Sequence, residues 1–137
     1  MKRTPLRRKT RIRARRLRRR LEVTDKELDD ACRAVVFARD GYRCRKTGQT
    51  HHLQWAHVYS RRYKSVRWDP DNGMCLSAGA HLLWHSQPAA MVLWWLGEVG
   101  EEFHQRLRAK LLAGDSVDRA ATLAWLRREL KRYELGT

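Results

Sequence analysis

The chain is organised around residues 55–85, which read W-A-H-V-Y-S-R-R-Y-K-S-V-R-W-D-P-D-N-G-M-C-L-S-A-G-A-H-L-L-W-H. His57 lies early in this stretch, Asn72 follows after fourteen intervening residues, and His81 and His85 come last. Two histidines four residues apart share one helix face, so both rings can reach one divalent cation. A histidine near the end of a strand can deprotonate water, and an asparagine amide can fix its imidazole. These residue types suit metal-assisted phosphodiester hydrolysis.

Local signals predict the structure that carries these residues. Residues 52–59 alternate loosely between apolar and polar and predict a strand, with His57 near its end. Asp71-Asn72-Gly73 is a turn signal, and residues 74–76 predict a short returning strand. Residues 78–85 then predict the helix that bears the two last histidines, ending near the Pro88 that follows.

The order of these elements, with these residues at these spacings, resembles the HNH (ββα-metal, His-Me finger) endonucleases, especially the short HNH proteins common in phages. The resemblance covers about half of the chain and includes a lead-in at residues 39–44. It further rests on residues 55–58, Arg61-Arg62, residues 67–73, and His81 with His85. It implies a ββα-metal core at about residues 52–86 and a nuclease function.

The resemblance also implies a role for each site residue. His57 is expected to be the general base, which requires a pKa near neutrality and a partner that fixes its tautomer. Asn72 is expected to brace the loop and orient the base. His81 and His85 are expected to bind one divalent metal ion, Mg²⁺, Mn²⁺, Ni²⁺ or Zn²⁺, which would bind the scissile phosphate and assist the leaving oxygen.

Basic residues crowd the loop between the expected base and the asparagine: Arg61, Arg62, Lys64 and Arg67. In the implied fold this loop lies beside the scissile strand, where arginine would clamp phosphate oxygens. The alternative is a solvated loop without a ligand. Trp68, in the same loop, is expected in the core.

The chain departs from these relatives at their structural zinc. Many HNH proteins of this type hold that zinc with two Cys-x-x-Cys knuckles. Here Cys44 is the one thiolate that remains, and the other ligand positions are occupied by Thr47, Ser77 and Ala80. We therefore expect no structural zinc, with the knuckle turn retained at Gly48.

Cys75 lies two residues before an expected knuckle position, and it is expected to point to the other face of its strand. The alternative is a makeshift metal site of Cys44 and Cys75 with His51 or His52.

A second departure concerns the affinity for the catalytic metal. Many family members place Asp or His immediately before the general base as a further ligand, whereas this chain has Ala56. Two histidines, phosphate and water would hold a cation more weakly, and Asp69 or Asp71 are candidates for an additional ligand.

Composition agrees with DNA as the partner. Thirty Lys and Arg against fifteen acids give a formal net charge of +15, which is typical of proteins that bind polyphosphates. Three cysteines without paired spacing argue for a reducing compartment, here the cytoplasm of a bacterial host cell. No apolar run approaches the roughly eighteen residues of a membrane span, so no membrane partner is expected.

Residues 1–22 are expected to form a basic arm that is disordered or becomes helical on DNA. The first twenty residues contain twelve Lys or Arg and no acid, and their apolar residues are too sparse to build a core. Counterion release would give such an arm salt-dependent affinity without sequence preference. The alternatives are a solubilising tail or a transit peptide, although transit peptides are usually Ser-rich and this segment contains no serine.

Residues 23–137 are expected to form a single domain. Thr24-Asp25-Lys26-Glu27 is a capping box ahead of a helix that reaches about Arg39. Apolar spacing predicts C-terminal helices within residues 88–134: one from Pro88, one at 98–113, and one capped by Asp115. The predicted fold class is therefore α+β and mostly helical, with flanking helices around the ββα-metal core.

These observations predict a divalent-metal-dependent DNA endonuclease of low sequence specificity that nicks or cuts DNA, encoded by a phage or prophage. It would act as a monomer, or as a homodimer paired through the apolar segment at Trp94-Trp95. The competing hypothesis is a catalytically silent nucleic-acid-binding protein on an HNH scaffold, which Ala56 and the lost knuckle cysteines favour. A third is a plain basic DNA- or RNA-coating protein with coincidental histidine spacing.

Overall fold

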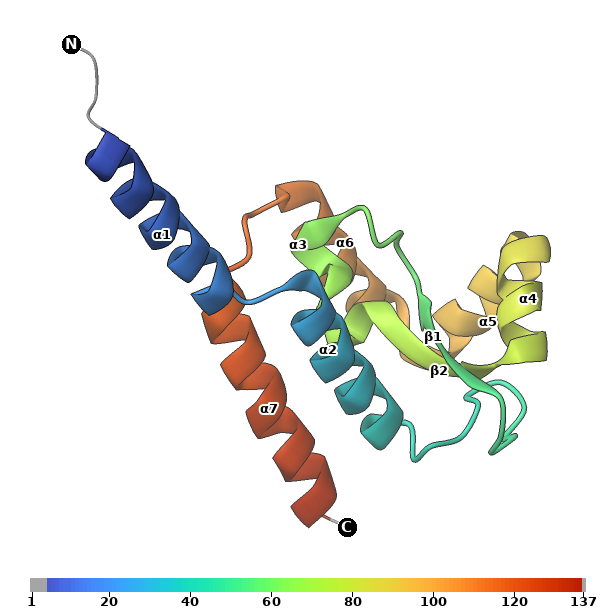
Figure 1. Ribbon diagram of the computed structural model, residues 1–137. Helices are drawn as coiled ribbons and strands as arrows, with labels where there is room; N and C mark the ends of the chain where they lie inside the picture. The colour runs from blue at the N-terminus through green and yellow to red at the C-terminus, as the bar shows by residue number, and fades with distance from the viewer. Residues whose placement is uncertain (1–4, 137) are drawn as a thin grey trace.

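The computed structural model describes residues 5–136 and has a mostly helical α+β architecture with one two-stranded antiparallel sheet (Figure 1). The strands are β1 (Leu53–His57) and β2 (Gly73–Ser77), and a short 3-10 turn, η1 (Pro70–Asn72), precedes β2. The helices are α1 (Pro5–Leu21), α2 (Asp25–Arg39), α3 (Lys64–Arg67), α4 (Ala78–Ser86), α5 (Pro88–Val99), α6 (Glu101–Ala113) and α7 (Arg119–Leu135). The predicted fold class is confirmed at this level. None of the helices in the described part of the chain could cross a membrane.

The two predicted strands form a ribbon in which His57 pairs with Gly73 and Leu53 pairs with Ser77. Both strand predictions are confirmed, each with boundaries shifted by one or two residues. Glycine is required at the pair opposite His57, because a Cβ on Gly73 would lie 2.6 Å from the indole nitrogen of Trp55.

Each face of this ribbon covers a hydrophobic cluster, because successive side chains of a strand point to opposite sides. Ala56, Met74 and Leu76 belong to a cluster formed with α4, α5 and α6. Trp55 and Cys75 face the other side, toward the buried residues of α2 and α7. The ribbon is therefore a middle layer between two groups of helices.

Most helix boundaries follow the signals in the sequence. The capping box of α2 is confirmed, since Thr24 accepts a hydrogen bond from the Glu27 amide while Glu27 accepts one from the Thr24 amide. The cap of α7 is a correction: Asp118, rather than Asp115, accepts the hydrogen bond from the helix, here from the Ala121 amide at 3.0 Å. Val117 packs into the cluster beside α2 and α7, which keeps the preceding residues extended.

One more boundary differs from the sequence prediction. Helix α5 begins at Pro88 as expected but continues through Gly97, and α6 begins at Glu101 rather than at residue 98. The break lies at Gly100, whose φ of +82° is a backbone conformation that favours glycine.

The basic arm also differs from the prediction, because residues 5–21 form helix α1 (Figure 1). The segment contains no glycine and consists largely of Arg, Lys, Leu and Ala, which are strong helix formers. The first four residues of the predicted arm lie outside the described residues.

Candidate active site

The two helix histidines meet at their ring nitrogens. Ser77 caps α4 by accepting a hydrogen bond from the Ala80 amide, and His81 and His85 follow on one exposed face of the helix. The Nε2 atoms of His81 and His85 lie 3.1 Å apart. Metal–nitrogen bonds of about 2.1 Å would separate two ligand nitrogens by about 3.0 Å in octahedral and about 3.4 Å in tetrahedral geometry. The pair is therefore spaced to share one cation.

Gln54 on β1 holds the ring of His81 from the opposite side. Its Oε1 atom lies 2.6 Å from His81 Nδ1, so Nδ1 carries the proton and donates it to the amide oxygen. This tautomer leaves the Nε2 lone pair of His81 free to accept from His85 or to bind a cation. Outer hydrogen bonds of this kind orient histidine ligands and raise their basicity.

The tautomers of the two rings are linked. With Nδ1 of His81 protonated, the 3.1 Å contact requires that His85 Nε2 donates and His81 Nε2 accepts. Burial and the neighbouring ring of His85 lower the pKa of His81, which favours this neutral form. A cation bound by both Nε2 atoms would shift the proton of His85 to its Nδ1.

Among the residues that the structure describes, no third protein ligand joins this pair. Across residues 5–136, no group of three or more His, Cys, Asp or Glu side chains could hold a metal ion. Ala56 is fully buried in the hydrophobic cluster, and neither Asp69 nor Asp71 joins the histidines. Asp69 instead accepts a hydrogen bond from Lys110 at 2.6 Å and another from the Asp71 amide at 2.9 Å. Asp69 is thus paired with Lys110, and a contribution of Asp69 or Asp71 to metal binding stays a prediction.

His57 occupies the last position of β1, with its ring packed on Trp55 at 4.1 Å between centroids. Its Nε2 atom is buried and has no hydrogen-bond partner. Burial and, secondarily, the charge of Arg61 lower the pKa of His57 to about 4. This differs from the expected pKa near neutrality, because the indole and the ribbon shield the ring from water. The imidazole is thus a neutral base at pH 7.

The structure brings Gln54, His81 and His85 together but does not bring the His57 ring into that group. Strand alternation directs His57 to the side of Trp55, facing α2, whereas Gln54 points to the side of α4. The backbone links the two: the indole of Trp84 on α4 donates a hydrogen bond to the His57 carbonyl at 3.0 Å. This bond ties α4 to the end of β1, although Gln54, which contacts His81, lies three residues before His57 in the strand.

Asn72 joins the segments on both sides of the ribbon end. It is fully buried, accepts a hydrogen bond from the Tyr59 amide at 2.8 Å, and donates one to the Tyr59 carbonyl at 3.0 Å. The amide thus holds the backbone two residues after His57 rather than the imidazole itself. This contact fixes where the chain goes after β1.

The basic loop is anchored to α2 by Asp29. This carboxylate accepts hydrogen bonds from both Arg67 and the indole of Trp68, at 2.7–3.0 Å, and from Arg61 at 2.8 Å. Burial opposes ionisation, but the hydrogen bonds of Arg67 and Trp68 and the nearby arginine charges lower the pKa of Asp29.

The four predicted phosphate-binding residues differ in how accessible they are to a ligand, because Asp29 pairs with some of them. Arg67 is largely buried and its guanidinium is committed to Asp29, so it is not free to clamp phosphate. Arg61 is more exposed, while Arg62 lies over the Tyr63 ring. The Lys64 side chain is exposed and lies 3.9 Å from the Asp25 carboxylate. Trp68 is buried, which confirms its expected place in the core.

The knuckle positions are still assembled around Cys44. Gly48 keeps a positive φ of +78°, and its amide donates to the Cys44 carbonyl at 2.8 Å, so the turn is retained as predicted. Burial would raise the pKa of the Cys44 thiol, but hydrogen bonds with Thr47 and Ser77 outweigh it and lower the pKa to about 7. Two of the substituted knuckle residues therefore contact the remaining cysteine by hydrogen bonds.

Cys75 lies in the cluster with α2 and α7, whereas Cys44 belongs to the cluster on the other face of the ribbon. With no group of three candidate ligands in residues 5–136, the makeshift site of Cys44, Cys75 and a histidine is not formed.

Three residues with a structural role at this site were missed from the sequence. Arg39 donates hydrogen bonds to the carbonyls of Pro70 and Gly73, on either side of Asn72, and Asp40 accepts one from the Cys75 amide. Gln54 lies on the same side of β1 as Ala56, the side that faces α4. Strand alternation in the sequence could have predicted this position. Arg39 and Asp40 lie in the lead-in segment at residues 39–44, but the sequence does not identify their hydrogen-bond partners.

Comparison of the chain with protein-family models, with curated proteins and with solved structures gave no match.

Proposed function

We propose that this protein is a divalent-metal-dependent DNA endonuclease of the HNH type, which hydrolyses phosphodiester bonds with little sequence preference. The observation that carries the proposal is the pair His81 and His85, whose Nε2 atoms lie 3.1 Å apart while Gln54 holds one ring in the ligating tautomer. A histidine pair that serves only packing has no need of an amide oxygen at 2.6 Å to select its tautomer.

A cation held by the two histidines would polarise a phosphate oxygen and stabilise the charge that develops during hydrolysis. Other residues of the protein would accept the proton, position the base and bind the substrate. His57, neutral at pH 7 because burial depresses its pKa to about 4, would be the proton acceptor, which requires that water reach its buried Nε2 atom. Asn72 fixes the backbone after His57, and Trp55 limits rotation of the ring. Arg61, Arg62 and Lys64 would hold the substrate backbone.

A specific observation favours a second candidate, a silent nucleic-acid-binding protein on the same scaffold. Ala56 offers no ligand, and the His57 ring lies on the face of the ribbon that does not carry the histidine pair. Catalysis would require one phosphate to reach both His57, at the end of β1, and the histidine pair beside Gln54, near its start. If no phosphate can reach both parts of the site, the basic surface would bind DNA without cleaving it.

The deciding experiment is cleavage of supercoiled plasmid with Mg²⁺, Mn²⁺, Ni²⁺, Zn²⁺ or EDTA, alongside DNA binding measured in EDTA. The nuclease proposal predicts metal-dependent nicking that His57→Ala and His81→Ala abolish without loss of DNA binding. His51→Ala, which changes an exposed histidine outside this group, is the matched control and should cleave normally. Intact DNA binding with no cleavage under any metal would establish the silent scaffold instead.

A further inference from the structure

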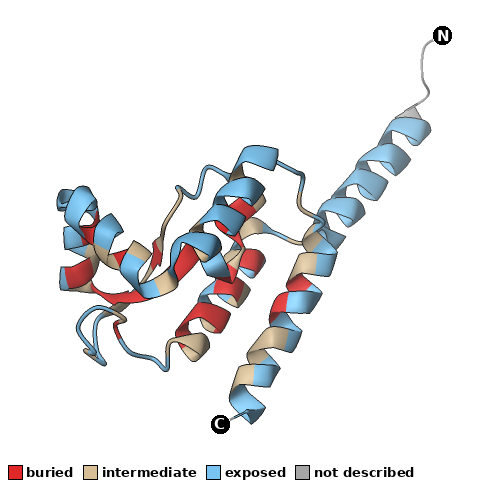
Figure 2. Ribbon diagram, turned by 180° about the vertical axis from the view of Figure 1, so that it is seen from behind, coloured by how far each residue is buried: buried red, intermediate tan, exposed pale blue. Residues whose placement is uncertain are grey.

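Helix α1 projects from the rest of the molecule and is exposed along its length (Figures 1 and 2). Every side chain from Leu6 to Leu21 is exposed, and ten of the seventeen residues are Lys or Arg with no acid among them. Seventeen residues at 1.5 Å each give a helix of about 25 Å. Nothing in the described structure covers a face of this helix, so its surface is available to a partner.

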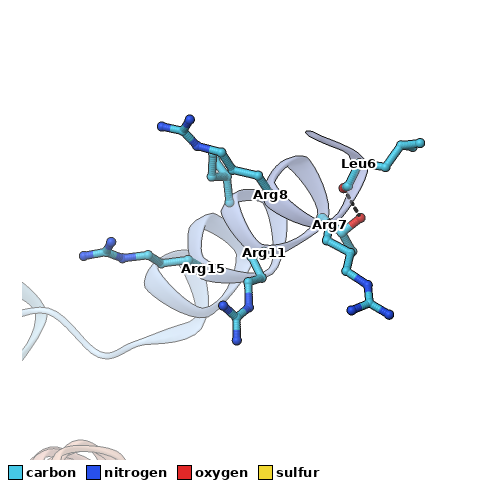
Figure 3. Close-up of a pocket in the computed structure, with 7 residues that line it drawn as sticks. Leu6, Arg7, Arg8, Arg11 and Arg15 are labelled. Carbon is cyan, nitrogen blue, oxygen red and sulfur yellow. Dashed lines mark hydrogen bonds between the residues drawn. The ribbon is translucent and has the colours of Figure 1, made fainter. Parts of the chain in front are cut away.

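The side chains of α1 are sorted around the helix. Leu6, Thr10, Ala14, Leu17 and Leu21 recur at four-, four-, three- and four-residue spacing, which places them in a stripe about 80° wide. The Thr10 hydroxyl donates to the Leu6 carbonyl at 3.1 Å, so the polar group in this stripe is already satisfied (Figure 3).

The ten basic residues occupy the remaining circumference in three groups. One flank of the apolar stripe carries Arg7, Arg11 and Arg18, and the other carries Lys9, Arg13, Arg16 and Arg20. The back of the helix, opposite the stripe, carries Arg8, Arg15 and Arg19 together with the exposed Ile12. Figure 3 shows the side chains of Arg7, Arg8, Arg11 and Arg15 spreading outward on different sides of the helix.

This distribution selects among partners by charge and shape. A second copy of α1 would bring two strongly positive helices together, and the narrow stripe is too small to offset that repulsion. The complementary surface is a groove with an uncharged floor and negative charge on both walls. The DNA major groove, about 12 Å wide, has phosphates along both edges and admits a helix of about 10–12 Å diameter. The A-form RNA major groove is too deep and narrow, and a single strand has only one phosphate backbone.

We infer that α1 binds in the major groove of duplex DNA, with its apolar stripe against the base edges and its two basic flanks against the phosphates. Apolar side chains contact thymine methyl groups there without demanding one sequence. The inference rests on the proposed function for the choice of DNA as the polyanion, and it deepens that function by naming duplex DNA as the substrate.

The test compares two triple variants of equal charge in the full chain. Arg7→Gln, Arg13→Gln and Arg18→Gln remove flank charges, whereas Arg8→Gln, Arg15→Gln and Arg19→Gln remove the same number from the back. Glutamine preserves helix propensity, and circular dichroism checks that both variants stay helical. Binding to a 20-base-pair duplex is followed by fluorescence anisotropy in EDTA across a salt series.

The flank variant should reduce the slope of log K against log salt by about 2–3, and the back variant by less than about 1. Methyl green, a major-groove ligand, should compete with binding, and the minor-groove ligand netropsin should not. Equal effects of the two triples, or equal affinity for an RNA duplex of the same sequence, would overturn the inference. The inference would also be overturned if the protein bound phosphatidylglycerol vesicles more tightly than DNA and if both triple variants lost this vesicle binding equally.

This result is independent of catalysis, because EDTA removes the metal. Plasmid that is bound through the flanks but never cleaved would refute the nuclease and leave the major-groove inference standing. Metal-dependent cleavage, combined with equal effects of the two triple variants on binding, would support the nuclease and refute the major-groove inference.

Discussion

His57 illustrates how neighbouring residues change the chemistry of a single side chain. In water an imidazole is partly protonated near pH 6.5, but here burial against Trp55 and the charge of Arg61 lower its pKa to about 4. The ring is therefore neutral throughout the physiological pH range and can accept a proton. Its lowered pKa also makes it a weaker base than an ordinary histidine.

The same depressed pKa links His57 to stability. Between about pH 6.5 and pH 4 the unfolded chain binds a proton at His57 that the folded chain does not, so this residue destabilises the fold as pH falls through that window. His57→Gln should therefore show a shallower loss of unfolding free energy from pH 6.5 to pH 4 than the wild type. Urea unfolding at several pH values measures it. His51→Gln is the control, and a slope for His57→Gln equal to that of wild type would contradict the assignment.

Gln54 should matter to metal binding although it is not a ligand. Gln54→Leu removes the acceptor for His81 Nδ1 and frees the ring to adopt the other tautomer. We expect affinity for Ni²⁺ or Zn²⁺ to fall by about 10–100-fold in calorimetric titration.

Gln105→Leu is the matched control for this change, because Gln105 is exposed and bonds only to Glu101 on its own helix. Unchanged metal affinity in Gln54→Leu would mean that the amide does not orient the ligand pair.

At the scale of elements, α2 organises the site although it contributes no candidate catalytic residue. Asp29 on its middle turns holds the basic loop, and Arg39 and Asp40 at its end hold the carbonyls and amide around Asn72 and β2. The helix packs between the ribbon and α7, so these contacts fix the loops on both sides of the ribbon end.

Asp29 and its neighbour Asp30 allow this role to be measured. Asp29→Asn removes the charge that pairs with largely buried Arg67, so it should lower the unfolding free energy by about 2–3 kcal/mol. Asp30→Asn breaks an exposed pair with Lys26 on the same helix and should cost about 0.5 kcal/mol or less. Chemical denaturation of both variants gives the comparison, and similar losses would show that the loop is not anchored through Asp29.

At the scale of the whole molecule, the positive charge is divided unevenly. The first 21 residues hold twelve of the thirty Lys and Arg and none of the fifteen acids, so residues 22–137 carry a formal charge of only +3. The body of the protein is therefore nearly balanced, and α1 supplies most of the electrostatic attraction to a polyanion.

Removal of residues 1–21 separates binding from folding. Because α1 contributes no residue to either hydrophobic cluster, the thermal midpoint of the remainder should change by no more than about 2 °C. DNA affinity should fall at least tenfold at 0.15 M salt, with a much flatter salt dependence, because the roughly seven phosphate contacts of the two flanks are lost. Calorimetry and anisotropy test the two parts, and an unchanged salt slope would mean that α1 does not touch DNA.

The sequence predicted the ribbon, α2 and α4 well because their signals are local. The capping box at Thr24, the turn at Asn72-Gly73, and the alternation through His57 act within a few residues and survive packing. Signals that depend on distant partners failed. Asp115 and Asp118 are equivalent as caps until Val117 is packed, and Arg67 resembles a phosphate ligand until Asp29 is beside it.

The sequence alone therefore determined the order of strand, turn, strand and helix, the placement of two histidines on one helix face, and the strongly basic N-terminal segment. These follow from periodicity, caps and composition, which are properties of neighbouring residues. Only the tertiary structure decided that Gln54 holds His81, that Asn72 bonds to the Tyr59 backbone, and that His57 is half-buried and neutral. Those features depend on distances between segments that are far apart in the chain, and packing of the ribbon between two groups of helices sets those distances.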